Sequence, residues 1–374
     1  MLFQKLMGKG PTSMISPSAP KGLWSWGNNT MGHLGLGDRV YRSVPTQVGA
    51  LTTWSQILGD NKRSLALKTD GTLWSWGYND YGYLGLGDTI KRSSPVQVGA
   101  LAAWSTIGSG KTSAFAIKTD GTLWSWGNYS GGVLGLGVSY VHRSSPTQVG
   151  TLATWSQITG GRNSISLALK TEGTLWVWGR GNGGQLGLGT YAVNHSSPVQ
   201  VGTLTTWSQI TAGEYVALAI KTDGTLWSWG KNTQGQLGQD IATTVYRSSP
   251  TQVGTLTTWS QIIAGHRGSL AIKTNGTLWS WGYNTGGQLG FSDIIGRSSP
   301  VQVGTLAAWA KIGAAEDTSF AIKIDGTLWA WGRNDYGKFG LGDTIHRSSP
   351  VQVGTLASWV KIVGGKNHLL GLHC

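Results

Sequence analysis

Residues 64–98 read SLALKTDGTLWSWGYNDYGYLGLGDTIKRSSPVQV, and this stretch decides the fold. Apolar residues alternate with small or polar ones over 64–68 and again over 72–76, which predicts two neighbouring strands. Asp70 and Gly71 lie between them, and this pair is typical of a tight β-hairpin turn. The stretch therefore predicts the start of an antiparallel sheet.

Two further strands complete the sheet. Pro95 stands at the start of a short strand at 96–98, where its missing N–H is tolerated. Residues 104–107 predict a fourth strand. The glycines of the L-G-L-G run between these elements permit tight turns. Each unit of the chain thus predicts four short strands and no helix.

The same unit recurs seven times. All 21 Trp belong to it: pairs of the form Trp-x-Trp begin at 24, 74, 124, 176, 227, 279 and 329, and single Trp lie at 54, 104, 155, 207, 259, 309 and 359. The two rings of a pair lie on one side of their strand. We expect Trp on one face of each sheet and Leu on the other to fill the gaps between neighbouring sheets. Seven such units predict an all-β protein, a seven-bladed β-propeller of four-stranded antiparallel blades.

The two ends of the repeated region complement each other. The first unit begins in its third strand at residues 22–27, and the last ends in its second strand at 368–373. Pairing of these N- and C-terminal strands would complete one blade and close the ring, which removes exposed strand edges. We therefore expect residues 1–21 to form an N-terminal leader or tether and residues 22–374 to form the propeller.

Composition excludes several classes of protein. Ten per cent aromatic and only 12% charged residues exclude a disordered chain, and one Cys excludes a disulfide scaffold. No apolar run is long enough for a transmembrane helix or a secretory signal, so we expect no membrane insertion. The location expected from this is a virion or the cytoplasm.

The unit resembles the repeat of the regulator of chromosome condensation family. The resemblance rests on the G-T-L-W-S-W-G-x-N-x-x-G-x-L-G-L-G-D core and the S-S-P-V-Q-V that follows it, and it covers residues 22–374. It implies a seven-bladed propeller but much less about function. The founding member is a chromatin-bound exchange factor for a small GTPase and uses a protruding wedge. Here successive Trp pairs are 50–52 residues apart, so no unit carries a long insertion.

The sequence offers no candidate residues for catalysis, and we expect no enzyme, no metal and no cofactor. The seven His do not recur at one position of the repeat. The Asp of the T-D-G turn has a turn role, and Glu172 and Asn275 replace it in two units. Such variation would be odd for a general base.

The net charge of +13 is largely periodic. One ring of Arg precedes Ser-Ser-Pro, and one ring of Lys precedes the T-D-G turn. Each of these side chains either braces a loop through backbone carbonyls or extends along apolar surface. The alternative is a basic annulus that meets an anionic surface or an acidic protein.

Departures between the units indicate a binding face. A fixed frame with variable polar and aromatic loops is typical of a recognition surface, although drift at solvent-exposed positions gives the same pattern. The first variable segment precedes S-L-A-I-K and should ring one end of the central channel, and the second follows W-S-W-G. The candidate binding residues in the first are Lys62, Arg63, Lys111, Arg162, Glu214, Tyr215, His266, Arg267, Glu316, Asp317 and Lys366. Those in the second are Tyr78, Tyr81, Tyr283, Arg333 and Tyr336.

These observations predict a non-catalytic binding or structural propeller that mediates protein or surface recognition. It would act as a virion (phage) or cell-surface component docked through its leader, with a protein partner or larger assembly. One alternative is a guanine-nucleotide-exchange-like regulator of a small GTPase. A second is a salt-sensitive binder of nucleic acid or an anionic surface. Specific nucleic-acid binding is not expected, since the Trp residues are predicted to be buried.

Overall fold

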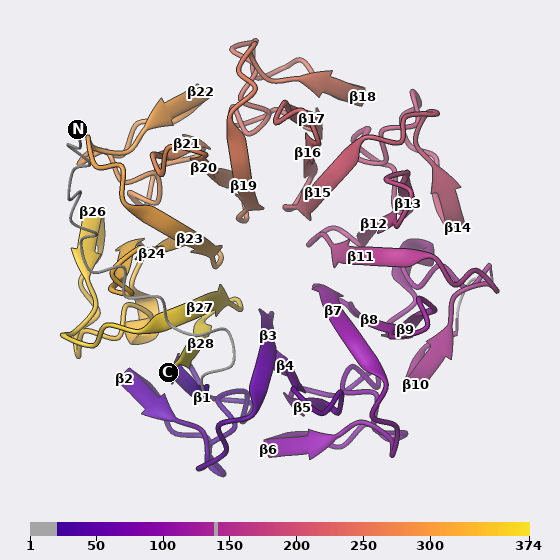
Figure 1. Ribbon diagram of the computed structural model, residues 1–374, viewed down its shortest axis with the longest axis vertical. Coiled ribbons are helices and arrows are strands. Elements are labelled where there is room, and N and C mark those ends of the chain that lie inside the picture. The colour runs from indigo at the N-terminus through magenta and orange to yellow at the C-terminus, as the bar shows by residue number, and fades with distance from the viewer. Residues whose placement is uncertain (1–20, 138–140) are drawn as a thin grey trace, which may run out of the picture.

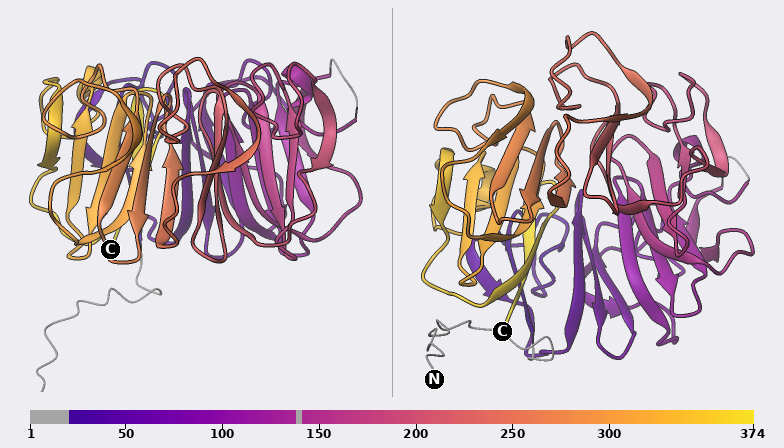
Figure 2. Two further views of the ribbon diagram at one scale, coloured as in Figure 1. Left: turned by 90° about the horizontal axis from the view of Figure 1, so that it is seen from above. Right: turned by 45° about the horizontal axis from the view of Figure 1, so that its top comes forward.

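The computed structural model describes residues 21–137 and 141–374, and these form a ring of seven blades around a central channel (Figure 1). Each blade is a four-stranded antiparallel sheet whose first strand lines the channel and whose fourth lies at the periphery. The ring has the thickness of one blade (Figure 2). The predicted seven-bladed, all-β propeller is thus confirmed. The leader lies outside the described residues except for Lys21.

The strands recur at the same positions of each unit. The channel strands are β3 (Trp54–Asp60), β7 (Trp104–Gly110), β11 (Trp155–Gly160), β15 (Trp207–Ala212), β19 (Trp259–Ala264), β23 (Trp309–Ala314) and β27 (Trp359–Gly364). The second strands are β4 (Arg63–Lys68), β8 (Ser113–Lys118), β12 (Ile165–Lys170), β16 (Val216–Lys221), β20 (Gly268–Lys273), β24 (Thr318–Lys323) and β28 (His368–His373). The third strands are β1 (Gly22–Gly27), β5 (Leu73–Gly77), β9 (Leu123–Gly127), β13 (Leu175–Gly179), β17 (Leu226–Gly230), β21 (Leu278–Gly282) and β25 (Leu328–Gly332). The peripheral strands are β2 (Arg42–Gln47), β6 (Arg92–Gln97), β10 (Arg143–Gln148), β14 (His195–Gln200), β18 (Arg247–Gln252), β22 (Arg297–Gln302) and β26 (Arg347–Gln352). Two 3₁₀ turns, η1 (Ser130–Gly132) and η2 (Asp335–Gly337), lie in loops after third strands.

One blade is composite, in the order β2-β1-β28-β27. Strands β1 and β28 pair antiparallel from Gly22 opposite His373 to Gly27 opposite His368. The terminal strands therefore close the ring, as the incomplete first and last units predict. Strand pairing through the backbone leaves neither of these strands with an open edge.

Neighbouring blades pack leucine against tryptophan. Leu65 and Leu67 of β4 and Leu73 of β5 form one buried cluster with Trp104 and Trp126 of the next blade. Equivalent clusters lie between the other blades. The predicted filling of the gaps by Trp on one face and Leu on the other is confirmed. Burial of each such ring removes about 150–250 Å² from water.

The second Trp of each pair also forms a polar link between blades. The Nε1–H of Trp126 donates to the carbonyl of Tyr83 in the preceding blade at 3.0 Å, and Trp126 is completely buried. Gly85 has a φ of +73°, and a Cβ there would lie 2.8 Å from this indole nitrogen. The glycine is therefore required both by the backbone conformation and by the close approach of the ring. All seven second Trp residues donate in this way.

The Lys ring has a packing role. In six blades the Nζ of the Lys that ends the second strand lies 3.5–4.0 Å from the ring centroid of the first Trp of the pair. Such cation–π contacts contribute about 0.5–2 kcal/mol each. In the composite blade His373 takes the place of the Lys and contacts Trp24 and Trp359. The interpretation that each Lys extends along apolar surface is confirmed.

The Arg residues of the Arg ring occupy equivalent positions in their blades, but only some of them are neutralised by a carboxylate. In four blades the Arg that opens the peripheral strand pairs with an Asp four residues earlier, as Arg92 does with Asp88 at 2.6 Å. These Arg also donate to a backbone carbonyl, as Arg92 does to Ile90. The loop-bracing interpretation is therefore confirmed for them. Arg143 differs, because Val138 stands where the four paired units have Asp, and Arg143 makes no ion pair within the described ranges.

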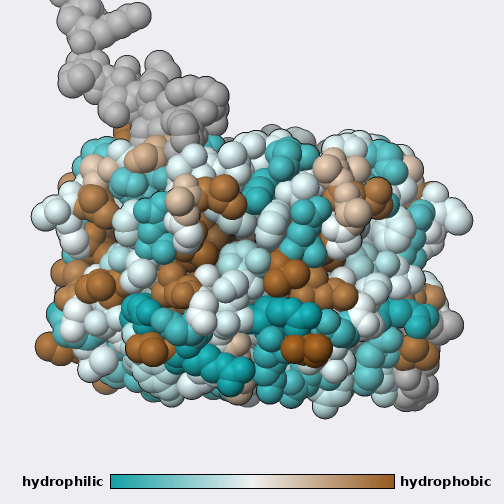
Figure 3. Space-filling model, turned by 90° about the horizontal axis from the view of Figure 1, so that it is seen from below, coloured by the Kyte–Doolittle hydropathy of each residue, from teal (hydrophilic) through white to brown (hydrophobic). Residues whose placement is uncertain are grey.

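The outer wall carries shallow apolar hollows between the peripheral strands of adjacent blades (Figure 3). Two of them, of about 400 and 410 Å³, are lined by equivalent residues, such as Leu51 and Trp74 in the first and Leu204 and Trp227 in the second. Their recurrence follows from the repeat and shows that the wall, like the core, is part of the repeated frame.

Candidate functional site

The two faces of the ring differ in sequence variability. One face is formed by the hairpins between the first and second strands of each blade and by the loops after the third strands, and we call it the loop face. The opposite face, which we call the turn face, carries the T-D-G turns. The turns are uniform: Asp70 accepts hydrogen bonds from the backbone N–H and the hydroxyl of Thr72, and Asn275 does the same for Thr277. The variable side chains therefore gather on the loop face.

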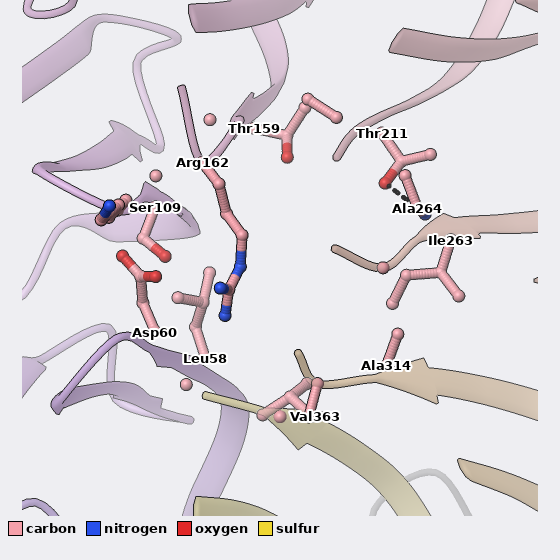
Figure 4. A pocket seen from close by; sticks show the side chains of 18 residues that line it. Leu58, Asp60, Ser109, Thr159, Arg162, Thr211, Ile263, Ala264, Ala314 and Val363 are labelled. Carbon is pink, nitrogen blue, oxygen red and sulfur yellow. Dashed lines mark hydrogen bonds between the residues drawn. The ribbon is translucent and has the colours of Figure 1, made fainter. Parts of the chain in front are cut away.

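The first set of predicted binding residues surrounds the loop-face end of the channel, which we call the channel mouth. The seven channel strands and the hairpins after them enclose a cavity of about 220 Å³ there (Figure 4). Asp60, Lys111 and Arg162 line it beside small residues such as Ala314. Of the first set, Lys111 and Arg162 line this cavity, so the hairpins that carry them lie at the end of the channel.

Charged side chains join blades across the mouth. Arg162 points into the cavity (Figure 4) and its Nη1 lies 3.3 Å from the Glu316 carboxylate, which belongs to a blade three positions away around the ring. The Nζ of Lys366 lies 3.8 Å from the other oxygen of Glu316. One carboxylate therefore holds cations from two other blades at the centre of the face.

A second group of charges spans three consecutive blades. The imidazole of His266 lies between two carboxylates, with Nε2 3.0 Å from Glu214 and Nδ1 3.8 Å from Asp317. Arg267 also contacts Glu214, at 3.1 Å. Burial opposes ionisation of Asp317, but His266 and Arg333 outweigh it and lower the pKa of this carboxyl. Asp317 is therefore an anion that the mouth holds in place.

Backbone hydrogen bonds between blades fix the hairpins that carry these side chains. The N–H of Arg162 donates to Gly213 at 3.0 Å, and that of Glu214 donates to His266 at 3.2 Å. The N–H of Lys366 donates to the carbonyl of Asn61 at 3.3 Å, from the composite blade to the blade that begins with β3. The variable side chains thus project from a rigid rim.

The second set of predicted residues lies farther from the channel on the same face. Tyr81 and Tyr336 are exposed, at 43% and 42%. The carboxylate of Asp80, which accepts from the Tyr78 hydroxyl, raises the pKa of Tyr78 to about 12. Tyr283 and Arg333 connect the two sets, since Arg267 lies over the Tyr283 ring and Arg333 lies 3.9 Å from Asp317.

Arg63 is not available for binding, and its inclusion in the first set is wrong. Its side chain is 2% exposed. The guanidinium pairs with Asp60 at 2.9 Å and donates to the carbonyls of Gly110 and Ser113 in the next blade. Arg63 therefore joins two blades beneath the surface.

Two buried groups near this face were not predicted from the sequence. Lys338 is 1% exposed, and burial lowers its pKa, with Asp335, Asp317 and Glu316 opposing that shift. It occupies a position where three other units have Gln, and this break in the repeat was the available signal. Lys338 thus lies beneath the side of the mouth that carries Glu316 and Asp317.

The other missed group lies at the seam of the composite blade. The rings of His33 and His368 are 4.5 Å apart, and both side chains are buried. The Ser64 hydroxyl donates to the carbonyl of His33 and lies 3.1 Å from Nε2 of His368. Because that hydroxyl proton is already used, His368 donates through Nε2 and is not placed to act as a base toward Ser64. The contact is structural.

Within residues 21–137 and 141–374, no three His, Cys, Asp or Glu side chains come together as ligands for a metal. No helix in that part of the chain is long and apolar enough to cross a membrane.

Fold and site define a seven-bladed propeller with one variable, charged face. Models of the regulator of chromosome condensation (RCC1) repeat match residues 22–59, 70–117, 120–168, 172–220, 223–272, 275–322 and 325–372. The chain belongs to the RCC1 repeat family. Its repeats account for nearly all of the propeller, as the resemblance of the unit implies.

Several curated proteins resemble part of the chain. The probable E3 ubiquitin-protein ligase HERC6 of Homo sapiens is 36% identical over 133 residues, which are 34% of this chain and 13% of that protein. Two relatives come from Arabidopsis thaliana. The mitochondrial RCC1 domain-containing protein RUG3 is 32% identical over 34% of this chain, and the ultraviolet-B receptor UVR8 is 32% identical over 36% of it. The matches span 30% and 31% of those two proteins, so this chain covers less than a third of the length of each of these relatives.

Solved structures share the whole fold at low identity. Human WBSCR16 superposes with a TM-score of 0.85 and 21% identity, over 94% of this chain and 98% of that one. Prp20p of Saccharomyces cerevisiae superposes with a TM-score of 0.80 and 21% identity, over 95% of this chain and 92% of that one. It is described with binding properties to Gsp1p and histones. Yeast RCC1 (Prp20) bound to Kap60 superposes with a TM-score of 0.82 and 20% identity. Propellers of this shape therefore bind protein partners, and at such identity the likeness to this chain shows the fold alone.

Proposed function

We propose that this chain is a non-catalytic binding propeller that recognises a protein partner through its loop face. The observation that carries the proposal is the placement of the variable charged residues: they gather at the channel mouth, on hairpins fixed by backbone hydrogen bonds between blades. The turn face, by contrast, repeats the same turn. A rigid frame with a varied central patch suits recognition.

The more specific roles predicted from the sequence, a virion or cell-surface component and a GTPase exchange factor, are supported to different degrees. The relatives named above lend none to a virion or cell-surface role, and that role stays a prediction from sequence. Exchange activity on a GTPase is the alternative, and the 50–52-residue spacing of the Trp pairs leaves no room for a wedge insertion. Three relatives are named as ligases of the HERC group, but the matched part is 13% or less of each.

The test is site-specific photo-crosslinking in extracts of the native source. A photoreactive residue at Tyr336 samples the loop face, and one at Leu306 samples the turn face, where that side chain is 52% exposed. We expect a specific adduct from Tyr336, with loss of the same adduct in Glu316→Lys. An adduct from Leu306 alone would place recognition on the wrong face and contradict the proposal.

A further inference from the structure

Carboxylates are unevenly distributed around the loop face. Of the 16 acidic residues, five lie in T-D-G turns or their equivalents on the turn face, and the other eleven lie on the loop face. None of those eleven belongs to the two adjacent blades β7–β10 and β11–β14. We call the loop-face side of these two blades the basic sector (Figure 1, violet to magenta). Its basic residues are Lys111, His142, Arg143, Arg162, Arg180 and His195.

The repeat supplies internal comparisons for two of these cations. Arg143 occupies the position of Arg92, but Arg92 pairs with Asp88, whereas Arg143 makes no ion pair in the described ranges and its buried Nε has no acceptor there. Arg180 occupies the position of Arg333. Arg333 lies 3.9 Å from Asp317, whereas Arg180 donates to the neutral hydroxyl of Ser130 at 2.7 Å. At both positions the Arg is retained, but the carboxylate that pairs with it in the other blade is missing.

The remaining cations extend the sector to the channel. Lys111 is exposed and lines the mouth, and no carboxylate of the described chain pairs with it. Arg162 reaches across the mouth to Glu316, which belongs to a blade three positions away, so one acidic group borders the sector at the channel. Uncompensated positive charge thus runs from the channel to the periphery over two blades, while the other blades mix both signs.

We infer that the basic sector binds an acidic polypeptide segment of a protein partner. The inference rests on the proposed protein-binding function and deepens it. Three of the four permanent cations are Arg, whose planar guanidinium suits bidentate contact with carboxylates. The aromatic rings of this region pack against one another: Tyr81 and Tyr129 both contact His142, with ring centroids 4.8 and 5.0 Å apart. They therefore do not form separate platforms on which the bases of a single strand could stack. These features favour a peptide over a single-stranded nucleic acid.

The test is fluorescence anisotropy with a labelled peptide of about twelve alternating Asp and Glu residues at about 50 mM salt. The sector variant is Arg143→Gln with Arg180→Gln. The matched control is Arg92→Gln with Lys231→Gln, which changes the same two frame positions and the net charge by the same amount. We expect roughly tenfold weaker binding for the sector variant and less than about twofold for the control.

Lys111→Gln provides a variant that leaves the frame intact, because this side chain is exposed. It should weaken binding about two- to threefold, with unchanged tryptophan fluorescence. Equal losses in both double variants, no binding by the wild-type chain, or tighter binding of an oligothymidylate of equal length would each overturn the inference. If the photoreactive residue at Tyr336 still crosslinks a partner in any of these cases, the proposed protein-binding function stands, but the partner does not bind through an acidic segment. If neither the peptide assay nor the crosslinking assay shows binding, the proposed function fails as well.

Discussion

Replacing Trp126 with Phe should weaken the contact between two blades by a magnitude that can be worked out. The indole is completely buried, and its N–H donates to the carbonyl of Tyr83 at 3.0 Å. Loss of the donor leaves that carbonyl without its partner, at a cost of about 1–3 kcal/mol. The smaller ring leaves about 40 Å³ unfilled, which adds roughly 1 kcal/mol.

The free energy of unfolding should therefore fall by about 2–4 kcal/mol, or about 3–5 °C in Tm for a cooperative ring of this length. Thermal unfolding followed by tryptophan fluorescence measures this change. Trp124→Phe is the control, since Trp124 is only half-buried and donates within its own hairpin to Thr122 at 2.9 Å. Its expected cost is about 1 kcal/mol or less. Equal falls in Tm for the two variants would refute the view that the second Trp joins the blades.

Two further predictions concern the seam. Deletion of residues 367–374 removes β28 and should open the ring, with a large fall in Tm; an unchanged Tm would refute closure by the terminal strands. Burial lowers the pKa of His33 to about 2 and that of His368 to about 3, so both are neutral in the fold. Their contribution to stability is complete above pH 6.5 and falls as the pH drops from 6.5 toward 3, by about 2–3 kcal/mol per imidazole at pH 4.5. His33→Gln should make the Tm difference between pH 7 and pH 4.5 smaller, and an unchanged difference would contradict the neutral state of this buried imidazole.

The frame was predictable because its signals are local and repeated. The T-D-G turn, the alternation of the flanking strands and the incomplete end units define four-stranded blades and their closure. The ring of Lys could be read as structural for the same reason: its partners, the Trp residues, recur with it. Placement of the first variable segment at the channel mouth followed from the position of the hairpins in the blade.

Features that depend on a neighbouring unit were not predictable. Arg63 looks like a surface residue in its own unit, but the carbonyls that bury it belong to the next blade. The pairing of Arg162 with Glu316 joins residues three blades apart, and only ring closure brings them together. The Arg ring was read from the sequence as one periodic set, whereas the structure shows that only four of its members have an Asp counterion four residues earlier.

The composite blade has a consequence for the covalent order of the chain. Residues Gly22 and His373 are paired neighbours at the turn face, where every other blade has a T-D-G turn. A turn of that type, placed between them, would make the polypeptide circular without moving a strand. New ends could then be opened at the turn of any other blade. The ring therefore has no obligatory first blade, and circular permutants cut at Gly71, Gly173 or Gly276 should retain the same seven blades.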